Sequence, residues 1–153
     1  MVRTDPQGGV MKVALASDHA GFKYKELAKE YLQQLGHEVV DYGTNSEERA
    51  DYPDFAHRAS EGILKGEAER GVFVCGSGIG ISIAANRHKG VRAVNAVTEE
   101  MAQLSREHNN ANVLAMGERL VDWDTAKKII DRFFATEFEG GRHEGRVEKI
   151  DNC

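Results

Sequence analysis

The apolar residues of the chain switch repeatedly between short continuous runs and a helical period. Continuous runs typical of buried strands cover residues 12–17, 38–42, 72–75, 91–97 and 113–116. Helical spacing follows each of them, over residues 24–35, 53–63, 79–87, 98–108 and 126–134. This alternation predicts a single-domain three-layer α/β/α sandwich with a five-stranded parallel, Rossmann-like sheet. In such a sheet the site is expected beyond the carboxyl ends of the strands.

The two ends of the chain lie outside this alternation. Residues 1–10 are polar and contain glycine, and we interpret them as an ordinary leader or an expression remnant, because Met11 opens the first strand. Residues 11–153 are then one domain, of a usual size for a single hydrophobic core. After the last predicted helix, residues 139–146 form a glycine-rich tail.

Charge and cysteine content exclude several kinds of partner. The formal net charge is −5, and the 20 Lys and Arg residues are scattered among 25 Asp and Glu residues, so nucleic acid is not expected as a main partner. No apolar run approaches the roughly 20 residues of a membrane helix, and the N-terminus lacks the apolar core of a signal peptide. The two cysteines show no CxxC spacing, which favours a reducing compartment. We therefore expect a cytoplasmic protein without a membrane partner.

Three glycines, Gly76, Gly78 and Gly80, lie between a buried strand and the start of a helix. Backbone N–H groups in such a loop can converge on an anion, and the helix dipole adds to them. The alternative is a tight turn that binds nothing. The spacing differs from the Gly-x-Gly-x-x-Gly fingerprint of dinucleotide sites and from the phosphate loop of nucleotide hydrolases, which ends in Gly-Lys-Ser or Gly-Lys-Thr.

Cys75 lies where the strand meets this loop. A sulfur near a helix N-terminus is in an environment that stabilises thiolate over thiol, and a thiolate can act as a base. The alternative is an inert cysteine of the core, where free cysteines are common. A cysteine phosphatase would need an arginine about six residues further on, and because Ile81 stands there we exclude that reaction class.

Other polar residues follow the strands and helices that lead toward this loop. Asp18 and His19 end the first strand and are expected to face Cys75 across a cleft, although Asp18 also suits a helix cap and His19 a solvated loop. His108 and Asn109 close the fourth helix, where a histidine is by default a dipole partner or a surface group.

Three arginines are candidates for binding a phosphate. Arg142 and Arg146 are four residues apart around a glycine-rich turn, and Arg119 follows the fifth strand; for the first two, a solvated tail is the alternative. The six histidines show no HxH or HExxH spacing and the thiols supply no second ligand, so no metal is expected.

Taken together, these segments resemble the sugar-phosphate isomerase family that contains ribose-5-phosphate isomerase B and the galactose-6-phosphate isomerase subunits. The resemblance runs from Met11 almost to the C-terminus. It rests on the segments SDHAG (17–21), DYP (51–53), CGSGIGISIAAN (75–86), LSREHN (104–109), NVL (112–114) and GGRHEGR (140–146).

The resemblance implies a reversible conversion between ribose 5-phosphate and ribulose 5-phosphate through an enediolate, without a cofactor, in the non-oxidative branch of the pentose phosphate pathway. Among the reacting groups, Cys75 matches the proton-abstracting base, Ser77 the hydroxyl that assists proton movement, and His108 the residue that opens the furanose ring. The positions that match substrate contacts are Asp18, which we also count as catalytic, His19, Gly76, Ser77, Gly78, Ile79, Gly80, Asn109, Arg119, Arg142 and Arg146. Gly76 to Gly80 would cradle the enediolate oxygen, and Arg142 and Arg146 would grip the phosphate.

The resemblance also implies a homodimer or homotetramer whose active site is shared between subunits. One branch of the family lacks this cysteine and uses a glutamate further along the loop as its base, near the position of Gly80. This chain has no acidic residue there, so Cys75 is the one base candidate in its loop. Two alternatives stay open at the level of sequence. One is the same reaction on a six-carbon substrate such as allose 6-phosphate or galactose 6-phosphate, and the other is a non-enzymatic module that binds a phosphorylated metabolite.

Overall fold

The computed structural model of the chain describes residues 9–153. The expected leader, residues 1–10, therefore lies almost entirely outside the described residues. Within 9–153, no helix is both long and apolar enough to span a bilayer.

Five parallel strands form one sheet in the order β2-β1-β3-β5-β4. They span Lys12–Ser17 (β1), Glu38–Asp41 (β2), Arg70–Cys75 (β3), Ala93–Asn95 (β4) and Val113–Gly117 (β5). The three central strands are buried along nearly their whole length because both faces are covered, which explains their continuous apolar sequences. The predicted sheet is confirmed.

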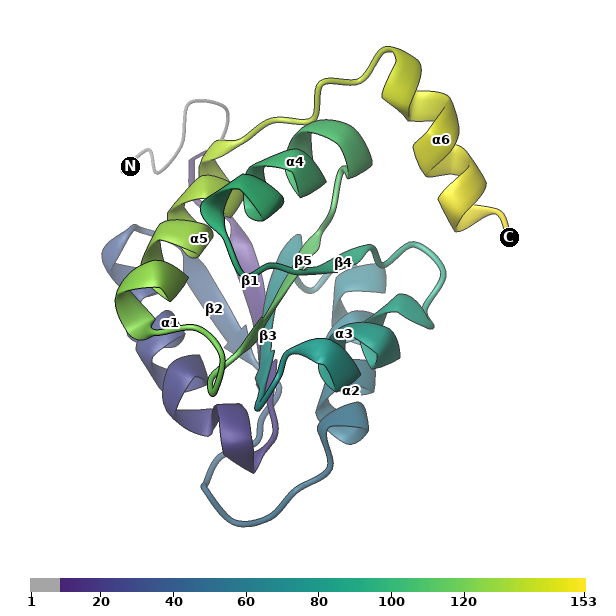
Figure 1. Cartoon of the computed structure of the whole chain (residues 1–153). Helices are drawn as coiled ribbons and strands as arrows, with labels where there is room; N and C mark the ends of the chain where they lie inside the picture. The colour runs from purple at the N-terminus through teal and green to yellow at the C-terminus, as the bar shows by residue number, and fades with distance from the viewer. Residues whose placement is uncertain (1–8) are drawn as a thin grey trace.

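Helices cover both faces of this sheet (Figure 1). They are η1 (His19–Gly21), α1 (Phe22–Gln34), α2 (Tyr52–Leu64), α3 (Ile79–Asn86), α4 (Glu99–Asn109), α5 (Trp123–Ala135) and α6 (Arg142–Asp151). Alternate strand residues enter two separate cores: Leu15 and Val74 pack with residues of α1, α4 and α5, whereas Ala16 and Cys75 pack with residues of α2 and α3. The predicted three-layer sandwich is confirmed.

The strand order places a switch point between β1 and β3. The chain runs from β1 outward to β2 and then returns to β3 on the other side of β1, so the connections leave the two central strands in opposite directions. Ser17 pairs with Val74 in register, and Cys75 pairs with Gly117. Residues that follow β1, β3 and β5 therefore meet at one edge of the sheet, the usual position of a ligand site in open α/β folds.

The fourth strand is shorter than the apolar run at 91–97 predicts. β4 covers Ala93–Asn95 at the sheet edge, and the side chain of Asn86 bonds both to the N–H of Ala93 at 2.7 Å and to its carbonyl at 3.0 Å. This side-chain pairing occupies the outer side of Ala93, where another strand would otherwise bind.

The tail also departs from the prediction. Gly140 and Gly141 form the glycine turn, but the two arginines that follow belong to a regular helix, α6, which buries His143 and Val147 against the rest of the domain. Figure 1 shows α6 lying beyond α4 and extending away from the sheet. Its far end is tied to the body by Arg92, whose guanidinium lies 2.8 Å from the carboxylate of Asp151.

Candidate active site

The thiol of Cys75 is held at the carboxyl end of β3 and is 4 % exposed. The backbone N–H of Gly78 donates a hydrogen bond to its Sγ at 3.2 Å. Gly78 has φ 80°, and a Cβ there would lie 2.4 Å from Oδ1 of Asn95, so this position requires glycine. The donor that contacts the sulfur is therefore fixed by the backbone of the loop.

The loop continues directly into α3, as the sequence predicts. The N–H of Ile79, the first residue of the helix, donates to Oγ of Ser77 at 3.1 Å. Below the loop, Nδ2 of Asn95 lies 3.5 Å from the carbonyl oxygen of Ser77. The positive end of the α3 dipole and its first amides thus point toward the surface in front of Cys75, an arrangement that favours negative charge.

Residues after β1 form a second wall. Asp18 accepts the N–H groups of Ala20 at 3.0 Å and Gly21 at 3.1 Å on one carboxylate oxygen, so the helix-cap alternative for this residue is confirmed. Nδ1 of His19 lies 3.1 Å from both the backbone nitrogen and the carbonyl oxygen of Ala50. The Ala50 backbone can therefore hold the imidazole as a donor or as an acceptor, and the ring is positioned in either tautomer.

Residues after β5 form the third wall. The N–H of Arg119 donates to the carbonyl of Gly76 at 3.0 Å, and the N–H of Glu118 donates to the carbonyl of Cys75 at 2.9 Å. These bonds hold the guanidinium of Arg119 over Gly76, where an added Cβ would lie 3.0 Å from Nη1. A cation is therefore available beside the glycine loop.

Together these walls enclose a cavity of about 580 Å³, which we call the carboxyl-edge cavity. Its lining includes the predicted site residues Asp18, His19, Cys75, Gly76, Ser77, Ile79, Gly80 and Arg119. Tyr52, Ile83 and Leu120 also line it, although none of them was a predicted site residue. Tyr52 lies inside the segment DYP that carries the resemblance, so a signal for it was present.

The remaining predicted residues do not line this cavity. His108 lies in the last turn of α4, where its ring stacks on that of His143 with centroids 4.5 Å apart. Arg142 and Arg146 are exposed and, being four residues apart in α6, share one face of that helix. The expected glycine-rich turn around them is therefore wrong. We call His108, Asn109, Arg142 and Arg146 the α4–α6 face.

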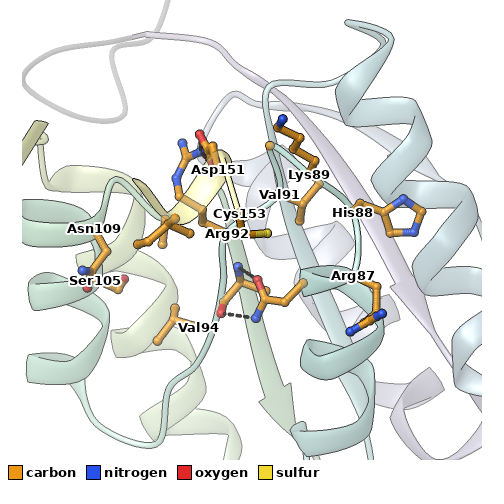
Figure 2. Close-up of a pocket in the computed structure, with 15 residues that line it drawn as sticks. Arg87, His88, Lys89, Val91, Arg92, Val94, Ser105, Asn109, Asp151 and Cys153 are labelled. Carbon is orange, nitrogen blue, oxygen red and sulfur yellow. Dashed lines mark hydrogen bonds and ion pairs between the residues drawn. The ribbon is translucent and has the colours of Figure 1, made fainter. Parts of the chain in front are cut away.

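Asn109 lines a second cavity of about 410 Å³ (Figure 2). Figure 2 shows Ser105 and Asn109 on one wall and Arg87, His88 and Lys89 on the other. The exposed thiol of Cys153 also lines this cavity.

The carboxyl-edge cavity thus lies at the switch point of a parallel α/β sheet, where enzymes of this architecture usually have their sites. A model of the ribose/galactose isomerase family matches residues 13–150. Ribose-5-phosphate isomerase B of Escherichia coli is 47 % identical over 139 residues, covering 91 % of this chain and 93 % of that protein. The chain therefore belongs to the ribose/galactose isomerase family, and it is an aldose–ketose isomerase.

Solved structures of relatives agree with this assignment. Ribose-5-phosphate isomerase B of Clostridium thermocellum has a TM-score of 0.92 and 47 % identity, with 93 % of this chain and 96 % of that chain covered. The enzyme of Thermotoga maritima has a TM-score of 0.91 and 50 % identity, with 94 % and 99 % covered. The enzyme of Mycoplasma genitalium, solved with bound ribulose 5-phosphate, has a TM-score of 0.88 and 40 % identity, with 92 % and 94 % covered.

Proposed function

We propose that this enzyme interconverts D-ribose 5-phosphate and D-ribulose 5-phosphate, the reaction of the non-oxidative pentose phosphate branch, in the cytoplasm. The observation that carries the proposal is the thiol of Cys75, whose sulfur accepts the Gly78 N–H at 3.2 Å inside a cavity of sugar-phosphate size. The names of the relatives support ribose 5-phosphate as the substrate. A reducing compartment would keep the Cys75 thiol in the form that can act as a base.

In the proposed mechanism, Cys75 thiolate removes the proton from C2 of the open-chain aldose and the electron pair moves toward the carbonyl oxygen. The resulting enediolate is stabilised by N–H groups of the loop from Gly76 to Gly80 and by the α3 dipole. The same proton, returned to C1, gives the ketose. Ser77, which follows Cys75 by two residues and lines the cavity, relays the proton between the substrate oxygens.

Asp18, His19 and Arg119 hold the substrate beside the loop. Because Asp18 spends one carboxylate oxygen on the η1 cap, its second oxygen is the acceptor that we assign to a sugar hydroxyl. His19, held at Nδ1 by the Ala50 backbone, lines the cavity, and Arg119 supplies positive charge near the developing oxyanion.

The α4–α6 face is assigned to a second subunit of a homodimer, whose His108 opens the furanose ring and whose Asn109, Arg142 and Arg146 bind the substrate and its phosphate. Two observations support this assignment. None of the four residues lines the carboxyl-edge cavity of its own subunit. The rim of that cavity also carries large exposed apolar residues, Ile79 at 53 %, Ile83 at 60 % and Leu120 at 62 %, which suit burial in an interface.

Substitution at Cys75 tests the chemistry. Cys75→Ala and Cys75→Ser should each lower kcat by about 10³-fold or more with an unchanged far-UV spectrum, because each removes the base. Near-wild-type turnover in either variant would remove the assigned base. A panel of ribose, allose and galactose phosphates, assayed with the wild-type enzyme, decides the substrate: a large preference for a six-carbon sugar would replace our assignment.

Mixing two variants that are each inactive on ribose 5-phosphate, and assaying the mixture with that substrate, tests the shared site. Equal amounts of Cys75→Ala and His108→Ala, exchanged to form mixed dimers, should recover about a quarter of wild-type activity, since each mixed dimer has one intact site. Recovery would fail if His108 acted on the cavity of its own chain. In addition, His108→Ala should lose more activity on ribose 5-phosphate than on ribulose 5-phosphate, which has no furanose ring to open.

A further inference from the structure

We propose that His108, Glu139 and His143 form a binding site for Zn²⁺ at the junction of α4 and α6. Within residues 9–153, these are the three residues whose nitrogen and carboxylate ligand atoms gather within 4.8 Å of one another. Nε2 of His143 lies 3.5 Å from Oε1 of Glu139, and Nε2 of His108 lies 4.0 Å from the same oxygen. Two imidazoles and one carboxylate are a ligand set that zinc commonly takes, with a fourth position left open.

The three ligand atoms would have to move only slightly closer together to bind a zinc ion. Ligand atoms about 2.0–2.1 Å from a tetrahedral zinc ion lie roughly 3.4 Å from one another. His143 is 7 % exposed and serves as the fixed ligand, whereas His108 and Glu139, at 38 % and 51 %, have room to move. A bound ion lies in the plane of each imidazole, so His108 must also rotate out of its stack on His143, where the two rings are 17° from parallel.

The backbone that carries the three ligands is already held in place. The N–H of Glu139 donates to the carbonyl of Glu107 at 3.0 Å, which fastens the segment before α6 to the last turn of α4. The buried guanidinium of Arg106 bonds to the carbonyl oxygens of Thr136 at 3.1 Å and Ala111 at 2.7 Å. Two segments distant in sequence are thus fixed side by side, which lowers the entropy cost of binding an ion.

Local spacing could not reveal this site, because the ligands come from α4, from the linker and from the start of α6. That is why the sequence predicted no metal. The exposed carboxylate of Glu139 supplies negative charge near Nε2 of both histidines, and neutral imidazoles supply the lone pairs.

The site has a consequence that rests on the proposed function. If Nε2 of His108 takes the ring-opening proton, a zinc ion bound to that nitrogen occupies the lone pair it needs. Zinc should then inhibit the conversion of ribose 5-phosphate more strongly than the reverse reaction from ribulose 5-phosphate, and a chelator should restore activity.

Calorimetric titration of ZnCl₂ into the full chain at pH 7.5 tests the site directly. Cys153→Ser serves as the background, because it removes the exposed thiol. We expect one zinc per chain, and Co²⁺ in its place should give the visible absorption bands of a tetrahedral site. Glu139→Gln and His143→Ala should each weaken binding by about 10-fold or more. Glu139 is half exposed, so its variant should fold even where loss of the buried His143 ring is destabilising.

The matched control is His57→Ala, which removes the other close histidine pair, with Nδ1 of His57 2.6 Å from Nε2 of His88. It should bind zinc like the background. Binding that survives Glu139→Gln, or that disappears in His57→Ala, would overturn the proposed site, as would a titration with no stoichiometric heat. Zinc binding without inhibition would keep the site and contradict the role of His108 in ring opening, so the two proposals fail separately.

Discussion

The carboxyl-edge cavity and the α4–α6 face are built by different means. In the cavity, strand pairing brings Asp18, Cys75 and Arg119 to one edge, and backbone hydrogen bonds set their positions. On the α4–α6 face, the buried side chain of Arg106 and one backbone hydrogen bond, from the Glu139 N–H to the Glu107 carbonyl, join α4 to the linker that leads into α6. A parallel sheet therefore fixes half of the expected site through its main chain, and the other half depends largely on a side-chain clamp.

The largest loss of stability and activity is expected for Gly78→Ala, which tests the half of the expected site that the main chain holds in place. A methyl group there meets Oδ1 of Asn95 and the carbonyl carbon of Met116, at 2.4 and 2.8 Å. The substitution should destabilise the fold by about 3 kcal/mol and lower kcat by roughly 100-fold, because the loop must shift away from Cys75.

Gly66→Ala is the matched control. Gly66 has a similar φ of 84° but nothing within 4 Å of the added carbon. Gly66→Ala should therefore lower the free energy of unfolding by only about 1 kcal/mol, the cost of placing a side chain on left-handed backbone, and leave kcat unchanged. Urea unfolding and steady-state kinetics compare the two variants. Equal losses of stability would mean that crowding against Asn95 is not what makes glycine necessary.

The second largest loss of stability is expected for Arg106→Met, which removes the side chain that holds the linker against α4. Removal of the guanidinium leaves the carbonyls of Thr136 and Ala111 without this donor and should cost about 3 kcal/mol. Hydrogen exchange should accelerate in α6 and in residues 136–141, while β1, β3 and β5 stay protected. Arg132→Met, which removes a side chain 42 % exposed, should cost less than about 0.5 kcal/mol. Uniform acceleration over the whole chain would contradict a local clamp.

A smaller effect on stability is expected at Asp41, the last residue of β2, when the pH is lowered. Burial alone would raise the pKa of Asp41, but hydrogen bonds from Lys25 and Lys29 and from the Gly43 N–H lower it overall. A carboxyl group with a lowered pKa in the folded state stabilises the fold above its unfolded pKa of about 3.9, and this contribution is lost as the pH falls through the folded value.

Asp41→Asn should therefore cost about 2 kcal/mol at pH 7, where the fully buried ammonium of Lys25 loses a partner at 2.7 Å, and much less at pH 3. Urea unfolding at both pH values measures the difference. Glu26→Gln, which changes the more exposed partner of the same lysine, should cost less at pH 7. A cost for Asp41→Asn that is equal at the two pH values would contradict the ion pair as its cause.

The smallest effect is expected at the His57–His88 pair, which belongs to neither half of the site. Burial lowers the pKa of His88, proximity to His57 lowers it further, and Glu61 partly opposes both. Because the unfolded chain binds the proton more readily, stability should fall by less than about 1 kcal/mol as the pH drops below about 6.5. His88→Gln should remove this slope in thermal melts. A slope that persists would place its origin elsewhere.

The contrast between the two halves also explains how much of the fold and of the expected site could be predicted from the sequence. The sheet was predictable because buried parallel strands have continuous apolar sequences, and the residues after β1, β3 and β5 were predicted to meet because parallel strands end at one edge. Asp18 and Cys75 do line one cavity. The place of Arg142 was not predictable, since α6 forms where His143 and Val147 find a surface on the domain. The grouping of Glu139 with His108 depends on the linker held by Arg106, and no local pattern encodes that contact.

The central position of β3 has a consequence for the growing polypeptide. Cys75 reaches its final surroundings only when β5 has paired beside it, because Gly117 is its partner in register and Arg119 follows two residues later. Synthesis proceeds from the N-terminus, so the sulfur of Cys75 emerges well before the strand that completes its enclosure. During that interval the thiol is accessible to solvent, and a chain released before residue 117 would expose both this sulfur and an unpaired edge of the sheet.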